Sequence, residues 1–230
     1  MIYCWSNIAF VIVAAATVSG YSFDNSEFNQ FLANDLDDLY SNFLHHRARR
    51  APPPEDDRCG PPRHRPKLCC AEEVFKAMHE ADRDIKQLCF KEITGMDRPE
   101  KPPHFDPFRC ENMEKHRSEI NCVFQCVAQK KGLADDSGNV IEDEYMKYVK
   151  ELLAEAPYMN SMVDKIAQDC LKEADTEEAS DGGCNPTAIK LAHCLFRDIQ
   201  LNCPEDQIED KQSCEMLQER LKSGPPPQSR

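Results

Sequence analysis

The chain has 230 residues, 13 cysteines and a formal net charge of −13 at pH 7. This length suits one domain with short appendages. The acidity argues against nucleic acid and anionic membrane surfaces as partners, because both attract a basic protein face.

The first 20 residues, MIYCWSNIAFVIVAAATVSG, form the only long apolar run, and no charged residue precedes Asp24. The apolar part, residues 8–18, has the length of the apolar region of a signal peptide and is short for a membrane span. The small residue Gly20 offers a cleavage site before Tyr21. We therefore predict a signal peptide at 1–20, secretion to the extracellular space and no membrane insertion after cleavage, with an uncleaved anchor as the alternative.

An acidic N-terminal extension is expected at residues 21–46. It places apolar residues at helical spacing, with acids on the other face and Asn25 or Ser26 as cap. A basic, proline-rich linker follows at residues 47–68. The linker begins with RARR (47–50), which fits a processing site in an exposed segment, so the removal of residues 21–50 is left open.

Helical periodicity dominates the rest of the chain, and no segment shows sustained alternation of apolar and polar residues. Asn185 followed by Pro186 is a strong helix start, because it pairs a capping residue with a proline at the first helical position. The fold class is therefore all-α, in a domain at residues 69–222 followed by a polar tail at 223–230. The expected helices are one from about Cys70 to Phe90, then 111–130, 141–155, 158–173, one from Pro186, and one after Pro204.

The cysteines predict a framework of disulfides. Loss of Cys4 with the signal peptide leaves twelve, an even number, which suits up to six bridges in an oxidising compartment. Cys122 and Cys126 lie one turn apart on one helix, about 5.4 Å along the axis, which does not suit a bond between them. Cys194 and Cys203 would face opposite ways on a continuous helix, so each of these residues needs a partner on another helix.

The spacing of six cysteines resembles that of the insect odorant-binding proteins, and further cysteines resemble their enlarged Plus-C subgroup, best represented in mosquitoes. The stretch NCVFQCVAQKKGLADDSGNVIEDEY (121–145) also resembles the family motif after the paired cysteines. The resemblance covers about residues 69–222, although the gap between Cys170 and Cys184 is short for the subgroup. The six are Cys89, Cys122, Cys126, Cys170, Cys194 and Cys203, and the subgroup features are Cys184, Cys203-Pro204 and Cys214.

This resemblance implies six or more helices, stapled by disulfides around a hydrophobic cavity, in a carrier of small hydrophobic molecules of the odorant or pheromone kind. It also implies a membrane odorant receptor as a partner, and a homodimer is a further possibility. Its implied bridges are Cys89–Cys126, Cys122–Cys194 and Cys170–Cys203. Three further bonds would then join, in an order left open, Cys59, Cys69, Cys70, Cys110, Cys184 and Cys214.

The candidate ligand-binding residues are aromatic, thioether and aliphatic side chains on the inner faces of the expected helices. Such a wall suits varied apolar shapes, and Tyr148 adds a hydroxyl group. The candidates are Phe75, Met78, Phe124, Tyr148, Met162, Leu195 and Phe196.

The sequence supports other functions less well than a carrier. A secreted interaction protein that binds another chain or itself is the main alternative to the carrier.

The sequence around Gly138 resembles a calcium loop, but Leu133 stands at its first ligand position and cannot coordinate. We expect no metal, no cofactor and no enzyme activity, because zinc knuckles and catalytic motifs are missing. His193, beside Cys194, is either an ordinary half-exposed histidine or a pH-sensitive group.

Overall fold

The computed structural model describes residues 25, 27–29, 31, 32, 67–95, 110–174 and 183–223, without the side chains of 110–117 and 223. Within these ranges the chain is helical, and the one strand-like feature is an isolated bridge between Ala134 and Val140. The all-α prediction is confirmed. The predicted signal peptide, nearly all of the predicted linker and Cys59 lie outside the described residues.

The helices follow the predicted order with shifted ends. The predicted helix ending near Phe90 continues for one more turn, to Thr94. Gly95 follows as its C-cap, and its positive φ of 70° suits a residue without a Cβ atom. The predicted helix at 158–173 begins later, at Val163, after a separate 3₁₀ turn. The elements are α2 (Glu72–Thr94), α3 (Cys110–Lys130), α4 (Glu142–Leu153), η2 (Pro157–Met159), α5 (Val163–Ala174), α6 (Thr187–Leu201), η3 (Glu205–Gln207) and α7 (Lys211–Ser223).

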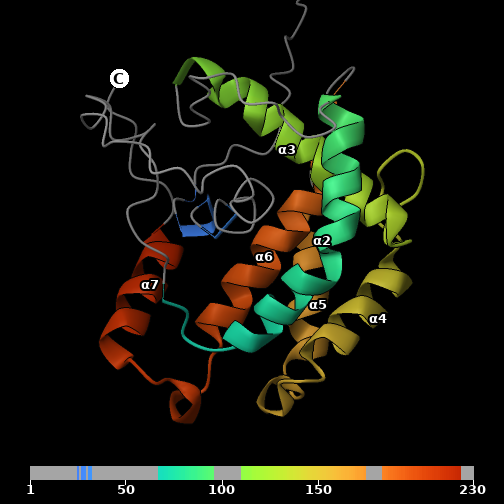
Figure 1. Ribbon diagram of the computed structural model, residues 1–230. Helices are drawn as coiled ribbons and strands as arrows, with labels where there is room; N and C mark the ends of the chain where they lie inside the picture. Colours follow the sequence, from blue (N-terminus) through green and yellow to red (C-terminus); the bar gives the residue numbers. More distant parts are fainter. Residues whose placement is uncertain are drawn as a thin grey trace, which may run out of the picture.

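Helix α6 forms the centre of the domain. It packs against α3, α5 and α7, while α2 lies along α3, and α4 lies against α5 (Figure 1). Burial on several sides explains why apolar residues appear around most of its circumference. Its buried residues are Ile189, Leu191, Cys194, Leu195, Phe196, Ile199 and Gln200.

The predicted cap of α6 is present. The Asn185 side-chain oxygen accepts hydrogen bonds from the Thr187 backbone N–H at 3.0 Å and from the Thr187 hydroxyl at 2.6 Å. The helix itself begins at Thr187, one residue after the expected position. Asn185 also donates its backbone N–H to the Gln125 side chain of α3 at 2.6 Å, so the cap attaches α6 to α3.

The loop between α3 and α4 is a tight turn built on Asp135. Its carboxylate accepts hydrogen bonds from the backbone N–H groups of Ser137 and Asn139, at 2.9 and 2.8 Å. The hydrogen bond from the Asn139 side chain does most to lower the pKa of Asp135. Gly138 has a φ of 82°, and a Cβ atom there would lie 2.7 Å from the Gln125 side chain. The carboxylate oxygens of Asp135 are therefore engaged in hydrogen bonds that stabilise the turn.

Five disulfides join the described residues, and one of the three predicted bridges is among them. Cys89 and Cys126 connect α2 to α3, with Cα atoms 5.7 Å apart, as predicted. The predicted Cys122–Cys194 and Cys170–Cys203 bridges are wrong. Cys122 instead joins Cys184, Cα–Cα 5.1 Å, and Cys170 joins Cys194, Cα–Cα 5.4 Å.

The packing of α6 explains the correction. Residues 184 and 185, before α6 begins, lie against α3, where Asn121 donates a hydrogen bond to the Cys184 carbonyl at 2.8 Å. Cys194, in the middle of α6, instead meets α5. Each partner is therefore one cysteine earlier in the chain than predicted. Among the six cysteines of these three bridges, the first pairs with the third, the second with the fifth and the fourth with the sixth. The predicted bridges have the same interlaced order.

Two more disulfides fasten the segment before α2 to the C-terminal part of the domain. Cys69 joins Cys214 of α7, and Cys70 joins Cys203, which follows α6. Gln200 lies between them, fully buried, and its side chain accepts from the Cys69 N–H at 2.7 Å and donates to the Cys70 carbonyl at 3.3 Å. The sixth possible bridge would involve Cys59 and the side chain of Cys110, both outside the described part of the chain.

Candidate functional site

An apolar cavity of about 110 Å³ lies between α2, α3, α4, α6 and the N-terminal segment. We use "N-terminal segment" for the described residues 25, 27–29, 31 and 32, drawn in blue in Figure 1. This volume is somewhat smaller than that of an engineered cavity of about 150 Å³ that binds benzene, so it suits at most about one small ring. Its lining is Phe28, Phe31, Leu32, Phe75, Met78, Asp82, Lys86, Val123, Phe124, Val127, Ala128, Lys131, Leu133, Val140, Tyr145, Tyr148, Ala188, Leu191, Ala192 and Leu195.

Five of the seven candidate ligand-binding residues line this cavity: Phe75, Met78, Phe124, Tyr148 and Leu195. The faces of α2, α3, α4 and α6 converge there, as the periodicity of those helices led us to expect. Their contact with a ligand stays a prediction.

Met162 and Phe196 lie elsewhere. Met162 stands in the turn between η2 and α5, and no residue of α5 lines the cavity, because α5 packs between α4 and α6. Phe196 is fully buried behind the lining, against Phe28 and Phe31, whose ring centroids lie 5.8 and 4.7 Å away. Phe196 therefore supports the cavity wall from behind.

The N-terminal segment supplies part of the lining that the candidate list lacks. Phe28 is fully buried and Leu32 is nearly so, while Phe31 lies with its ring centroid 5.2 Å from that of Phe75. The Asn25 side chain accepts a hydrogen bond from the Phe28 N–H at 2.8 Å, which is the capping role predicted for Asn25 or Ser26. The helical spacing of the aromatic residues was a usable signal, but the sequence did not show which helices they would meet.

A charged group of side chains lies at one part of the lining. The Lys131 ammonium group lies 2.7 Å from the Asp82 carboxylate and 4.1 Å from the ring centroid of Tyr148. Both members of this ion pair are mostly buried, with side-chain exposures of 17% and 10%. A buried pair that is also hydrogen-bonded neutralises itself, so this part of the cavity does not require a charged ligand.

Tyr145 lines the cavity, but its hydroxyl oxygen is closed off from solvent. The residue is 4% exposed, and this oxygen has no hydrogen-bond partner among the described residues. Burial, and next the negative charge of Asp198, raise the pKa of Tyr145, so the hydroxyl stays protonated. It was not among the predicted residues, although it lies one turn before Tyr148 on α4.

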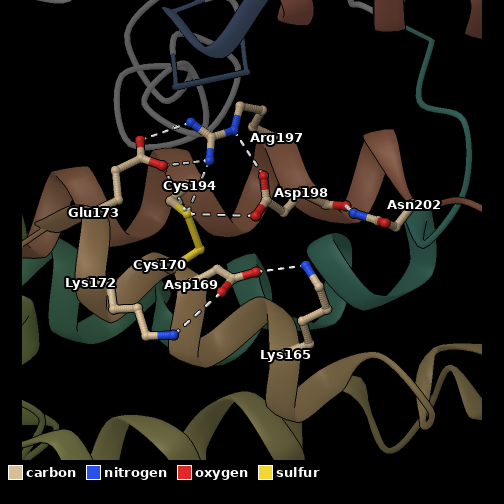
Figure 2. Close-up of a disulfide and its surroundings, with 9 residues drawn as sticks. All are labelled: Lys165, Asp169, Cys170, Lys172, Glu173, Cys194, Arg197, Asp198 and Asn202. Atoms are coloured by element: carbon tan, nitrogen blue, oxygen red, sulfur yellow. Dashed lines mark hydrogen bonds and ion pairs between the residues drawn. A yellow bond between two sulfur atoms is a disulfide. The ribbon is translucent and has the colours of Figure 1, made fainter.

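A cluster of charged side chains lies at the junction of α5 and α6 (Figure 2), and no residue of α5 lines the cavity. Arg197 holds Glu173 through two hydrogen bonds, of 2.8 and 2.6 Å, and holds Asp198 through a third of 2.8 Å. This cluster lies beside the Cys170–Cys194 disulfide and lowers the pKa of Glu173, mainly through the Arg197 hydrogen bond. It fixes α5 to α6 in addition to the disulfide.

His193 connects this junction to the N-terminal segment. Its ring stacks on Phe28 with centroids 4.7 Å apart. Burial, with a smaller effect from the positive charge of Arg197, lowers the pKa of His193 to about 4, while Glu173 acts in the opposite direction. The histidine is therefore neutral at pH 7.

Two groups of residues in the described part of the chain bring three metal-ligand atoms close together. One contains Cys89 and Cys126, and the other contains Cys170 and Cys194. All four sulfurs are in disulfides, so neither group offers the thiolates that a zinc site of this kind needs.

The model of the PBP/GOBP family matches residues 71–198, more than half of the chain. The matched range contains Cys89, Cys122, Cys126, Cys170, Cys184 and Cys194, which are the six cysteines of the three interlaced bridges. Cys203 lies beyond it, which agrees with the corrected assignment. Searches of curated proteins and of solved structures found no significant match.

Proposed function

Because the chain belongs to the PBP/GOBP family, whose members are carriers of small ligands, we propose that it is a secreted carrier of small hydrophobic molecules. Binding is reversible, involves no chemical step and takes place in the cavity lined by Phe75, Phe124 and Leu195. The observation that carries this proposal is an apolar cavity between helices, of which α2, α3 and α6 are joined to their neighbours by disulfides.

The energetics are consistent with a cavity that a ligand fills. An empty apolar cavity costs about 24 cal/mol per Å³, or about 3 kcal/mol for 110 Å³. A single disulfide contributes about 2 to 4 kcal/mol, mainly by restricting the unfolded chain. The stability contributed by one disulfide therefore offsets the cost of the empty cavity. A bound ligand restores the van der Waals contacts that the empty cavity lacks.

We also propose membership of the Plus-C subgroup. The Cys69–Cys214 and Cys70–Cys203 bridges support it, because they add to the six-cysteine set at the positions where the sequence resembles that subgroup. A homodimer and a membrane odorant receptor stay predictions of the same resemblance.

Secretion through a signal peptide at residues 1–20 is part of the proposal. Five disulfides support an oxidising compartment. No helix in the described ranges combines the length and the apolar character that a membrane span requires. We place the mature start at Tyr21, because Phe28 and Leu32 belong to the core of the domain and a start at Ala51 would remove them.

The direct experiment fills the cavity by mutation. Ala192→Phe places a ring in the lining of α6, whereas Ala81→Phe adds the same ring on the exposed side of α2. Acetophenone, titrated calorimetrically into refolded mature protein, should bind to wild type and Ala81→Phe, and at least tenfold more weakly to Ala192→Phe. Ala188→Leu is a smaller filling change at the same lining, in case Ala192→Phe does not fold.

Circular dichroism checks the helical fold of each variant. Equal binding by wild type and both folded lining variants would mean that the ligand binds outside the cavity. Failure of a panel of small apolar compounds to bind wild type would reject the carrier function and favour the interaction protein.

A further inference from the structure

Two adjacent cysteines, Cys69 and Cys70, each have two possible partners in the C-terminal part of the domain. Cys69 joins Cys214 and Cys70 joins Cys203, over sequence separations of 145 and 133 residues. An exchange of partners would change each separation by a single residue. The entropy of closing a loop depends on the logarithm of its length, so it does not distinguish the two arrangements. The pairing is therefore decided by the local structure around the cysteines.

The side chain of Gln200 binds the backbone of both adjacent cysteines. Its oxygen accepts a hydrogen bond from the Cys69 N–H at 2.7 Å, and its amide nitrogen donates to the Cys70 carbonyl at 3.3 Å. The two bonds act on opposite ends of the Cys69-Cys70 unit, so they fix the direction in which each Cβ atom leaves the chain. A rotation of this unit about the chain axis would turn both sulfurs away from their present partners and break both bonds.

Gln200 is itself placed between the two partner cysteines. It stands three residues before Cys203, near the end of α6. Its backbone carbonyl accepts a hydrogen bond of 2.9 Å from the side chain of Gln218 on α7, one turn after Cys214. Its side chain is fully buried, where an amide without partners would lower stability. One residue therefore connects the adjacent cysteines to both elements that supply their partners.

The residue after the two cysteines is also held by the domain. Ala71 has a φ of 61°, a left-handed conformation that is unfavourable for a residue with a Cβ atom. Its N–H donates a hydrogen bond of 3.1 Å to the Tyr158 hydroxyl oxygen. Backbone strain of this kind persists only where the surrounding structure imposes it. The backbone from Cys69 to Ala71 therefore has a conformation set by its contacts with the rest of the domain.

We propose that Gln200 selects the pairing of Cys69 with Cys214 and of Cys70 with Cys203 during oxidative folding. Each bridge forms when two thiols pass two electrons and two protons to glutathione disulfide, which becomes two glutathione thiols. The bridges then exchange until the most stable set remains. The Gln200 amide favours the observed set because it satisfies the Cys69 N–H and the Cys70 carbonyl in that arrangement. This inference is independent of ligand binding and of the proposed carrier function.

The test removes one partner, so that the two adjacent cysteines compete for the other. In Cys203→Ser, refolded with reduced and oxidised glutathione, Cys214 should pair with Cys69 and leave Cys70 free. Adding Gln200→Met keeps the length of the side chain but removes the amide. The ratio of Cys69–Cys214 to Cys70–Cys214 should then fall at least tenfold, which corresponds to about 1.4 kcal/mol. Alkylation of free thiols, followed by tandem mass spectrometry with fragmentation between residues 69 and 70, measures this ratio.

Leu217→Ala in the same Cys203→Ser background is the matched control. It removes a buried side chain of α7 that cannot hydrogen-bond to the cysteines, so it should lower stability and leave the ratio unchanged. Gln200→Asn, whose amide is one methylene group shorter, should also lower the ratio, and it serves if circular dichroism shows that Gln200→Met does not fold.

A Cys69–Cys70 bond in a Gln200 variant would likewise show that selection is lost. An unchanged ratio in a folded Gln200 variant would overturn the proposal, and so would a mixture of pairings in Cys203→Ser alone.

Discussion

Two parts of the cavity lining, apart from the residues of α4, are held in different ways. The stapled wall consists of the lining residues of α2, α3 and α6, and disulfides tie these helices to their neighbours. The N-terminal wall consists of Phe28, Phe31 and Leu32, which reach the domain through ring contacts and burial. One wall is fixed covalently, and the described part of the other is fixed by packing.

This difference indicates where the cavity opens most easily. Moving a helix of the stapled wall strains disulfides, whereas moving the N-terminal wall breaks only non-covalent contacts. Each ring pair among them is worth about 0.5 to 1.5 kcal/mol beyond the area buried. Ligand exchange should therefore proceed past Phe28, Phe31 and Leu32. Mutations on the two walls should have different effects on stability and binding.

The largest expected effect comes from Phe28→Ala, which removes the most buried ring of the N-terminal wall. It should lower the free energy of unfolding by about 3 to 5 kcal/mol and weaken ligand binding, because the cavity loses a side. Urea denaturation and acetophenone titration measure the two quantities. Phe90→Ala, in the second hydrophobic cluster around Cys89 and Cys126, is the control and should lower stability without changing affinity.

Removing a bridge from the stapled wall should have a smaller and different effect. The double change Cys122→Ala and Cys184→Ala should reduce stability by about 2 to 4 kcal/mol, because the unfolded chain gains freedom. Affinity for acetophenone should change less than threefold, since the packing around Asn185 and Gln125 remains. A folded double variant that no longer binds would show that the bridge itself shapes the cavity.

Acid should loosen the contact between the N-terminal wall and α6. The pKa of His193 is about 4 in the folded protein, against 6.5 for an unperturbed histidine. The unfolded chain therefore binds a proton first as the pH falls, so the stability contributed by neutral His193 is present above pH 6.5 and is lost between about pH 6.5 and 4. The loss is up to about 3 kcal/mol, with Arg197 and Glu173 as the charged neighbours.

Thermal denaturation of wild type and His193→Phe across this range measures the effect. The variant keeps a ring against Phe28 but does not titrate, so its stability should depend less on pH between 6.5 and 4. Identical pH profiles for the two proteins would assign the acid sensitivity to other groups.

The smallest effect is expected at the outer edge of the N-terminal wall. Arg220 of α7 donates a hydrogen bond of 3.2 Å to the Glu27 carboxylate, but the Arg220 side chain is 62% exposed. Arg220→Ala should cost about 1 to 3 kcal/mol, because the Glu27 carboxylate, with its side chain 6% exposed, loses a hydrogen-bond partner. A loss as large as that of Phe28→Ala, measured in the same urea series, would show that charge rather than packing holds this wall.

The sequence predicted features that depend on local chemistry. The Asn185 cap, the end of α3 at Lys130 and five residues of the cavity lining follow from capping rules and from the apolar periodicity of single helices. These signals lie within one helix or at its ends. They do not depend on how the helices are placed relative to each other.

The two wrong bridges, the place of Met162 and the surroundings of Tyr145 depend on which helix faces which. Cys194 has the right spacing for several partners, and only the packing of α6 on α5 selects Cys170. Met162 has the right period but stands in a turn before α5. Tyr145 resembles any apolar residue on α4 until its neighbours are known, because a hydroxyl without a partner is a property of the surroundings.

If both walls contact one ligand in one cavity, nuclear Overhauser effects from acetophenone to side-chain protons should show it. We expect simultaneous contacts to Phe31 of the N-terminal wall and to Leu195 of the stapled wall, and none to the exposed Met216 of α7. Contacts to Met216 or to other surface residues, without contacts to Phe31 and Leu195, would contradict it.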